Sequence, residues 1–499
     1  WLISEEPCGF RLTNVVLHGL VTALGALLAA AWSRRTGAGL FAGALFAVLP
    51  VHVEAIAGAV NRAEVQAALF YVGALLAVLL AQRSARGRTW GVALALFVLA
   101  LGSKEHAITL PVAAAVLWFE ALIAHRRTPT RFARPKSPPL WVLAGTVAAT
   151  LAFIWLRRQI LPAAFLGDIP ASDNPIAGLD SISQLQTAFR VLFHALRVIA
   201  TPVRLGADYG PNVIPALTGW DPVALAGLGL AIAGFLATAW AFRHDLGLAG
   251  ALVLFAVLYA PVSNFVLPSS AILGERLLYL PSVALCLAFG RLADRGWQAA
   301  ESRALGWVLA LATVLLCATY AARSAVHVRA YRDELTLFQA TVAAYPESVR
   351  ARQNLAVALV GRGRIDEAEP AASAAEHLSG GDPDARLTLG DIAFRRGQPD
   401  RAMELAYASL SLRPSRAAMK LLCRADTSVE RWRDGAEHCR VAAEAAPTEA
   451  EWHHRRGVSL LRLDRDLEAR RALDRAMEIE PGHPGVTEAL AELKRRAAR

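Results

Sequence analysis

The chain has 499 residues, of which 55% are hydrophobic and only 19% are charged, with a mean hydropathy of +0.37. This composition excludes an ordinary soluble protein, which carries more charge and fewer long apolar runs. The net charge of +10 does not indicate nucleic-acid binding, because much of the arginine lies in short segments between apolar runs, where membrane topology explains it.

Apolar stretches long enough to cross a bilayer recur between Leu12 and Ala322 and stop before Tyr331. About 20 helical residues cross a hydrocarbon core of roughly 30 Å. The sequence therefore predicts an all-α fold, with a polytopic transmembrane helix bundle in residues 1–324 and a separate domain in residues 331–499. The ten predicted spans lie at about 13–32, 39–58, 64–82, 89–102, 106–123, 140–160, 222–242, 246–266, 276–293 and 304–322.

Basic residues concentrate in alternate loops of this predicted bundle. They follow the first, third, fifth, seventh and ninth spans, and include Arg34, Arg35, Arg83, Arg86, Arg88, Arg126, Arg127, Arg131, Arg134, Lys136, Arg243, Arg291, Arg295 and Arg303. By the positive-inside rule that side is cytoplasmic. The C-terminal domain then lies on the external side. We expect a bacterial inner membrane and a periplasmic domain, because Arg and Ala are abundant, or the ER membrane and lumen in a eukaryote.

Residues 161–221 form a long loop that is predicted to be external. Its segment 189–203 is apolar enough to suggest a span, but it carries Arg190, His194 and Arg197 at helical spacing. If this segment crossed the membrane, every later basic loop would face outward. We therefore predict an amphipathic helix that lies in the membrane interface.

The C-terminal domain contains a repeat. Alanines recur at 34, 34 and 33 residues and prolines at 33 and 34, at positions Ala368, Ala402, Ala436, Ala469, Pro414, Pro447 and Pro481. This is the period of tetratricopeptide repeats. We predict repeats at about 349–382, 383–416, 417–449 and 450–482, after a lone helix at 331–345 and before a closing helix at 484–498. Such solenoids present a concave surface that suits a protein partner; a purely structural role is the alternative.

Cys423 and Cys439 fall within one predicted repeat. A disulfide between them requires an oxidising compartment. Two buried free thiols are the favoured interpretation of this pair.

Ionisable residues gather at the external ends of the predicted spans, where their burial is costly and function is the first hypothesis. Three groups and one further residue are candidates: His52, Glu54, Arg62 and Glu64; Lys104 and Glu105; Glu275, Arg276 and Tyr279; and Asp208. Arg and Lys suit a phosphate group, whereas His and carboxylates could orient a hydroxyl and take its proton. The alternative is that these residues snorkel or pair at helix ends.

The ordered segments Leu12–His18, Pro50–Ala55, Arg62–Glu64, Ser103–Glu105 and Glu275–Ser282, followed by the repeats, resemble the family of transmembrane and tetratricopeptide-repeat-containing proteins. That family is similar to protein O-mannosyltransferases of the GT-C superfamily. The resemblance implies about eleven spans and inverting transfer of mannose from a polyprenyl-phosphate carrier to Ser or Thr on the external face. One N-terminal span is then expected to be missing before Trp1.

The resemblance also places an acidic pair, taken as the catalytic base, upstream of Trp1, with Glu5 and Glu6 as weak replacements. No catalytic residue is therefore assigned within the chain. We expect Arg62, Lys104 and Arg276 to contact the carrier phosphate. The sugar or acceptor site is assigned to His52, Glu54, Glu64, Glu105, Glu275, Tyr279 and Asp208.

No metal-ligand set is visible in the sequence, so the expected cofactor is none beyond the lipid-linked sugar, and a divalent metal stays open. The expected partners are the membrane lipid, the polyprenyl-phosphate sugar and an acceptor or partner protein held by the repeats, and no nucleic acid. Two alternatives remain: a polymerase or ligase of cell-envelope glycan, and a non-enzymatic membrane-anchored repeat scaffold.

Overall fold

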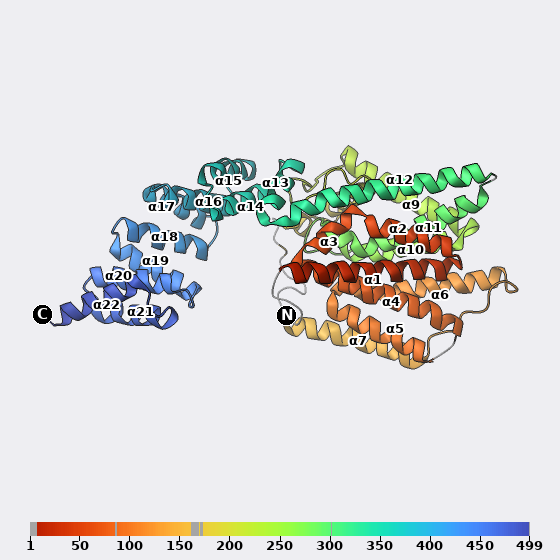
Figure 1. The fold of residues 1–499 in the computed structure, drawn as a ribbon, viewed down its shortest axis with the longest axis horizontal. Helices are drawn as coiled ribbons and strands as arrows, with labels where there is room; N and C mark the ends of the chain where they lie inside the picture. The colour runs from red at the N-terminus through yellow and green to blue at the C-terminus, as the bar shows by residue number, and fades with distance from the viewer. Residues whose placement is uncertain (1–6, 85–86, 161–168, 170–172, 301, 499) are drawn as a thin grey trace. The chain divides into compact units, whose positions relative to one another are not determined.

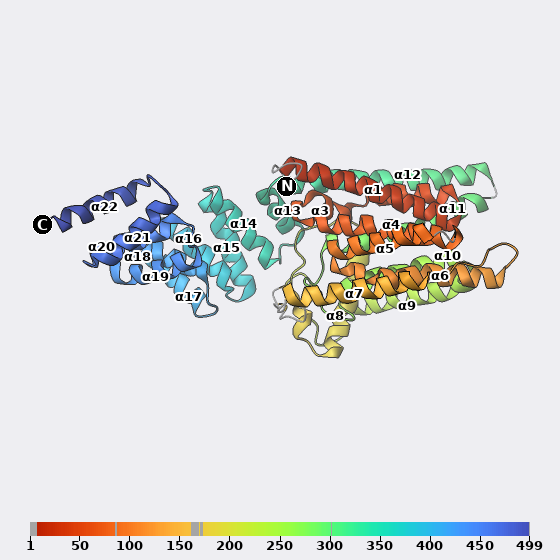
Figure 2. The same ribbon diagram turned by 90° about the horizontal axis from the view of Figure 1, so that it is seen from below.

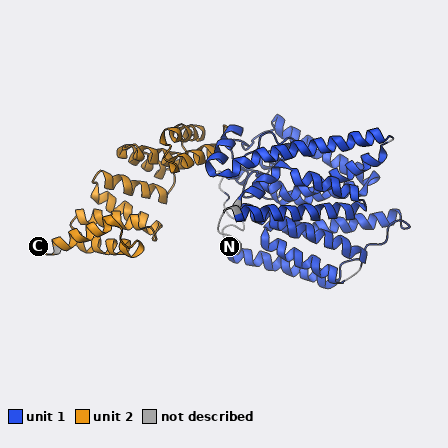
Figure 3. Cartoon of the chain, in the orientation of Figure 1, with its two compact units in different colours: residues 1–345 blue, residues 346–499 orange. Residues whose placement is uncertain are grey.

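The computed structural model describes residues 7–84, 87–160, 169, 173–300 and 302–498, and the secondary structure of this described part is helical throughout. The chain divides into two compact units, residues 1–345 and 346–499 (Figure 3). The first unit contains the apolar helices and the second contains the repeats, as the predicted all-α architecture requires.

Long apolar helices make up most of the first unit. Its α-helices are α1 (Pro7–Ser33), α2 (Thr36–Val48), α3 (Val53–Ala57), α4 (Arg62–Ser84), α5 (Gly87–Ser103), α6 (Leu110–Arg127), α7 (Leu140–Ile160), α8 (Ser181–Ala200), α9 (Pro222–His244), α10 (Leu246–Tyr259), α11 (Tyr279–Ala299), α12 (Arg303–His327) and α13 (Glu334–Ala344). Helices α1, α6 and α12 run roughly parallel in both views (Figures 1 and 2).

Seven of the described helices are long and apolar enough to cross a membrane, and an eighth span forms if a bent pair counts as one. That pair joins α2 to residues 50–57 with a bend of 55°. The remaining two predicted spans correspond to α5 and to Leu246–Val262, which are shorter apolar helices. At about 1.5 Å per residue these two fall short of the roughly 30 Å of a hydrocarbon core.

Pro50 explains the bend after α2. It stands at the first position of a short 3-10 helix, Pro50–His52, that leads into α3. A proline has no backbone N–H and its ring disfavours a helical residue before it, so α2 ends at Val48 and the chain turns. The turn brings His52 and Glu54 into the interior of the unit, where both are buried.

The apolar helices alternate in direction (Figure 1). The loops that carry the basic residues therefore fall at one end of the unit, and the segments that carry the candidate residues fall at the other end. Ion pairs link the helices at the basic end. Asp245 binds Arg291 at 2.5 Å and also binds Arg295, while Arg35 lies 3.6 Å from Asp294.

The long loop contains α8, which starts eight residues before the predicted amphipathic segment. Its start is set by Asp180, whose side chain accepts hydrogen bonds from the backbone N–H groups of Ile182 and Ser183. One face of α8 packs on α9. The approach is close at Gly227, where a Cβ atom would meet the Phe189 carbonyl oxygen at 1.9 Å.

The second unit is a stack of helix pairs with the predicted period. The pairs are α14 (Val349–Gly361) with α15 (Ile365–Ser379), α16 (Pro383–Arg395) with α17 (Pro399–Leu410), α18 (Arg416–Ser428) with α19 (Trp432–Ala445), and α20 (Ala450–Arg462) with α21 (Asp466–Ile479), followed by α22 (Pro484–Ala497). Gly457 lets α20 and α21 meet, because a Cβ there would lie 2.6 Å from Leu473. The helix before the repeats, α13, lies within the first unit.

Cys423 and Cys439 form a disulfide that joins α18 to α19. The expectation of two free thiols is therefore wrong. Both cysteines occupy the buried faces of an antiparallel helix pair, and their Cα atoms lie 4.7 Å apart. Such a separation permits a disulfide, but it follows from how the two helices pack and cannot be read from a spacing of 16 residues.

Candidate functional site

The centre of the candidate site is an ion pair between Glu54 on α3 and Arg276, which lies in the short 3-10 helix Glu275–Leu278 before α11. Glu54 Oε1 binds Arg276 Nη1, and Glu54 Oε2 accepts the Arg276 backbone N–H at 2.8 Å. The Glu54 side chain is 5% exposed, whereas that of Arg276 is 33% exposed. The carboxylate is thus inside the unit, and the guanidinium reaches toward its surface.

Glu275 connects the long loop to this ion pair through hydrogen bonds. Its Oε1 accepts hydrogen bonds from the Gly206 backbone N–H at 2.8 Å and from the Tyr209 hydroxyl at 2.7 Å. Its Oε2 lies 3.4 Å from His327 Nε2, at the end of α12. Burial, followed by the charge of Glu275, raises the pKa of Tyr209 well above its usual value, so the phenol stays protonated and donates.

A buried polar cluster lies beneath the ion pair. His52 Nε2 and Ser282 Oγ are 2.8 Å apart, and His18 Nδ1 and the Tyr279 hydroxyl are 2.7 Å apart. The rings of His52 and Tyr279 are in contact, with their centroids separated by 4.6 Å. His52 Nδ1 is buried and has no hydrogen-bond partner among the described residues. These contacts order the start of α11, which carries Tyr279 and Ser282.

A second ion pair joins Glu64 at the start of α4 to Lys104, which follows α5. Lys104 Nζ lies 3.0 Å from Glu64 Oε1, and His106 Nδ1 lies 3.6 Å from Glu64 Oε2. As in the first pair, the carboxylate is buried, at 3% exposure, and the cation is 29% exposed. Glu64 is near enough to Arg276 to interact with it electrostatically, so the two pairs belong to one site.

Three other predicted site residues lie outside the contacts described so far. Arg62 donates from Nε to Asn14 Oδ1 at 3.1 Å and from Nη2 to the Phe10 carbonyl at 3.3 Å. Glu105 faces Arg157 on α7 at 3.5 Å. Asp208 is buried, and its Oδ2 accepts the Gly210 backbone N–H at 3.2 Å, within the loop that Glu275 holds.

Sequence reasoning did not assign roles to several residues that shape this site, namely Asn14, His18, Ser282, His327 and Tyr331. His18 and Ser282 lie in segments that carry the family resemblance, and His327 ends an apolar helix, so each offered a signal. Tyr331 offered none, because its contacts with Val53 and Ala57 depend on packing. Glu5 and Glu6 lie outside the described residues.

The arrangement offers hydrogen-bond donors to an anionic group. Among the described residues, no three His, Cys, Asp or Glu side chains are grouped so as to hold a metal. Arg276 uses only Nη1 for Glu54, and no hydrogen bond within the described part of the chain occupies its Nε or Nη2. A phosphate could accept from these two donors in the fork geometry that guanidinium groups provide.

Comparisons with known proteins match this architecture. The tetratricopeptide-repeat family model matches residues 321–383 and 354–417. The protein O-mannosyl-transferase TMTC3 of Mus musculus is 25% identical over 526 residues, and the match covers 96% of this chain. TMTC3 of Homo sapiens is 24% identical over 525 residues, again with 96% of the chain covered. The chain is therefore similar to the TMTC proteins along nearly its whole length.

The chain spans about half the length of the curated relatives it matches, 56% of both the mouse and the human protein. Tmtc2 of Drosophila melanogaster is 32% identical over 223 residues, which cover 43% of the chain and 23% of that relative. Among solved structures, one of MamA is similar to 30% of this chain, and the match covers 87% of the MamA chain, with 22% identity and a TM-score of 0.28.

Proposed function

We propose that the chain belongs to a membrane glycosyltransferase that moves a hexose, mannose in the first instance, from a polyprenyl-phosphate carrier to Ser or Thr of a protein. The observation that carries this proposal is the relation to proteins named O-mannosyl-transferases over 96% of the chain, through both units. The cluster around Glu54 and Arg276 supports it, since it places cations beside buried carboxylates at one end of the apolar helices.

Arg276 and Lys104 are the proposed contacts of the carrier phosphate. Both present a partly exposed cation whose partner carboxylate is buried. Arg276 offers a planar fork and Lys104 a point charge, and these are complementary ways to bind phosphate oxygens. Arg62 donates to Asn14 and to a backbone carbonyl, so we assign it to positioning the starts of α1 and α4.

The proposed transfer needs a base and a leaving group. The acceptor hydroxyl loses its proton to a base and attacks the anomeric carbon, the bond from that carbon to the phosphate oxygen breaks, and the polyprenyl phosphate leaves. Cations beside the phosphate stabilise the charge that develops on it. Glu54 and Glu64 already neutralise cations inside the unit, so we assign them to orienting Arg276 and Lys104, and we assign no described residue as the base.

We place the site and the repeats on the external face. The basic loops lie at the opposite end of the helices, which the positive-inside rule makes cytoplasmic. The disulfide between Cys423 and Cys439 supports this side for the repeats, since disulfides persist in the periplasm and the ER lumen rather than in the cytosol. The repeats would then hold the acceptor protein on the face where the sugar is transferred.

The test uses the full-length product of the gene that encodes this chain. The purified protein is incubated in detergent with polyprenyl-phosphate mannose and a Ser/Thr-rich peptide, and mass spectrometry detects a hexose on the peptide. Arg276→Met should abolish transfer and weaken donor binding. The matched control is Arg35→Met, which breaks an ion pair at the opposite end of the same unit and should leave transfer unchanged.

Three other outcomes would contradict the proposal in different ways. Transfer that survives Arg276→Met removes the phosphate role of that residue. Donor binding without transfer to the peptide indicates a glycan acceptor, as in a cell-envelope polymerase or ligase. A protein that does not bind the donor at all is better described as a membrane-anchored repeat scaffold.

A further inference from the structure

A cavity of about 400 Å³ lies among α4, α5, α6 and α7, away from the candidate site. Most of its wall is apolar, and includes Phe97, Leu110 and Leu143. Its volume falls within the usual range of small-molecule sites. Neither the ion pairs described above nor the repeats contribute to it.

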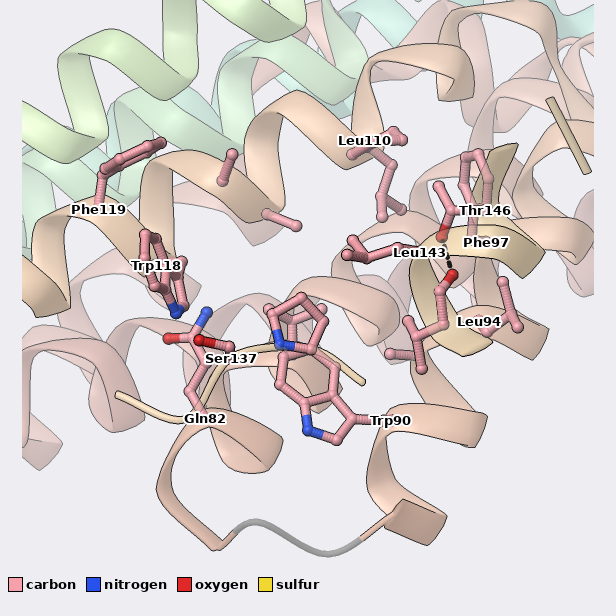
Figure 4. Close-up of a pocket in the computed structure, with 17 residues that line it drawn as sticks. Gln82, Trp90, Leu94, Phe97, Leu110, Trp118, Phe119, Ser137, Leu143 and Thr146 are labelled. Carbon is pink, nitrogen blue, oxygen red and sulfur yellow. Dashed lines mark hydrogen bonds between the residues drawn. The ribbon is translucent and has the colours of Figure 1, made fainter. Parts of the chain in front are cut away.

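One part of this cavity is polar and unsatisfied. Gln82 is 3% exposed, and neither its amide oxygen nor its amide nitrogen has a hydrogen-bond partner among the described residues. The Trp118 indole N–H is likewise buried without a partner among them. Figure 4 shows the Gln82 amide, the Trp118 indole nitrogen and the Ser137 hydroxyl close together at one side of the cavity. A buried amide without partners is costly, so a ligand with hydrogen-bonding atoms would be favoured here.

The polar part lies toward the basic end of the unit. Gln82 is in the last turn of α4, and its backbone carbonyl accepts the Lys136 backbone N–H at 2.9 Å. Lys136 itself is exposed beside Ser137, in the loop between α6 and α7. A molecule that enters from this membrane face would place a polar group at Gln82 and an anionic group near Lys136.

The cavity is open toward the side of the bundle. Phe119 on α6 and Leu143 on α7 both line it and are 56% and 47% exposed. Helix α7 packs on α5, whereas α6 packs on α4 and α10, so the opening lies between α6 and α7. In a bilayer this opening faces lipid.

We propose that the cavity binds one acyl chain of a membrane glycerolipid from the leaflet at the basic end, with its ester carbonyl at Gln82 and Trp118. The two side chains provide N–H donors for that carbonyl, and the apolar wall accepts the chain. The tail of a polyprenyl-phosphate carrier fits less well, because its phosphate would lie at the candidate site. Only apolar isoprene units would then reach Gln82, and the amide would stay unpaired.

The experiment uses the full chain in vesicles of phosphatidylethanolamine and phosphatidylglycerol that contain a phosphatidylglycerol with a photoreactive diazirine in one acyl chain. After illumination, mass spectrometry locates the labelled peptides. We expect labels within residues 110–119 and 140–146. Ala115→Phe fills the cavity and should reduce this labelling by about tenfold or more. The matched control is Ala152→Phe, on an exposed part of α7 outside the cavity, which should leave labelling unchanged.

Gln82→Leu keeps the volume of the side chain and removes its hydrogen bonds, so it should weaken labelling by about three- to tenfold. This variant decides the question if Ala115→Phe fails to fold. Labelling that neither variant reduces would overturn the proposal. So would stronger labelling of the same peptides by a diazirine polyprenyl phosphate, because that result would assign the cavity to the carrier tail.

Discussion

Replacing Arg276 by Met tests whether the ion pair with Glu54 orders the candidate site. The substitution removes the positive charge beside the buried Glu54 carboxylate. Of its contacts with residue 276, only the hydrogen bond from the backbone N–H remains. Removing one partner of a buried pair costs about 3–5 kcal/mol. Because one third of the Arg276 side chain is exposed, water can reach part of the freed space. We therefore expect a loss of about 2–3 kcal/mol in the free energy of unfolding.

The pair is isolated by a double-mutant cycle. Glu54→Gln alone should cost about 1 kcal/mol, because Arg276 keeps access to water. The double variant, Glu54→Gln with Arg276→Met, should be more stable than Arg276→Met alone, because no carboxylate is left unpaired. Thermal unfolding in detergent, monitored by size-exclusion chromatography, ranks the variants by stability. A change of 1 kcal/mol shifts Tm by about 2–4 °C in domains of 150–250 residues and by less in a larger unit.

Transfer activity separates structure from function in the same set of variants. If Arg276 contacts the carrier phosphate, the double variant regains stability but stays inactive. Additive stability effects of the two substitutions would refute the ion pair as an energetic unit. Recovery of both stability and transfer in the double variant would show that Arg276 serves only to neutralise Glu54.

Three further measurements address other parts of the chain. Gly227→Ala should separate α8 from α9 and lower Tm by several degrees, whereas Gly229→Ala, which has no atom within 4 Å of its added Cβ, should not. Replacing Cys423 and Cys439 by Ala should destabilise the repeats by about 3 kcal/mol in thermal melts, and reductant should have no effect on that variant. Burial, followed by nearby arginines, lowers the pKa of His194 to about 4. The unfolded state then binds more protons than the folded state between about pH 4 and 6.5. Acidification from pH 7 to 5 should therefore lower the free energy of unfolding by about 2 kcal/mol, and by less in His194→Gln.

The architecture was predictable because its signals are local in sequence. Apolar runs of about 20 residues mark helices that cross a membrane, and a period of about 34 residues marks the repeats. The placement of basic residues in alternate loops gave the two ends of the bundle. Residues 87–103 and 246–262 follow the same composition, but the helices there are shorter than a full span, since composition does not set the residue at which a helix ends.

Pairing within the candidate site was less predictable. Glu54 and Arg276 are separated by 222 positions. Their contact joins the helix after the bend at Pro50 to the 3-10 helix before α11. The same holds for Glu275, whose partners Gly206 and Tyr209 come from the long loop. Sequence reasoning placed these residues at one end of the bundle, but only packing decides which carboxylate holds which cation.

The exposures within the two ion pairs change how the site is understood. From sequence, Glu54 and Glu64 were predicted to contact the sugar or the acceptor, just as the basic residues were predicted to contact the carrier phosphate. In the structure both carboxylates are nearly fully buried, and each holds a cation that is about one third exposed, Arg276 and Lys104. A ligand that approaches this end of the bundle would therefore meet the two cations first, and under the proposed function the carboxylates position them. Since an ion pair already neutralises each cation, the proposed phosphate would be bound here through directed N–H donors more than through net charge, and the fork of Arg276 would favour a phosphate group over anions in general.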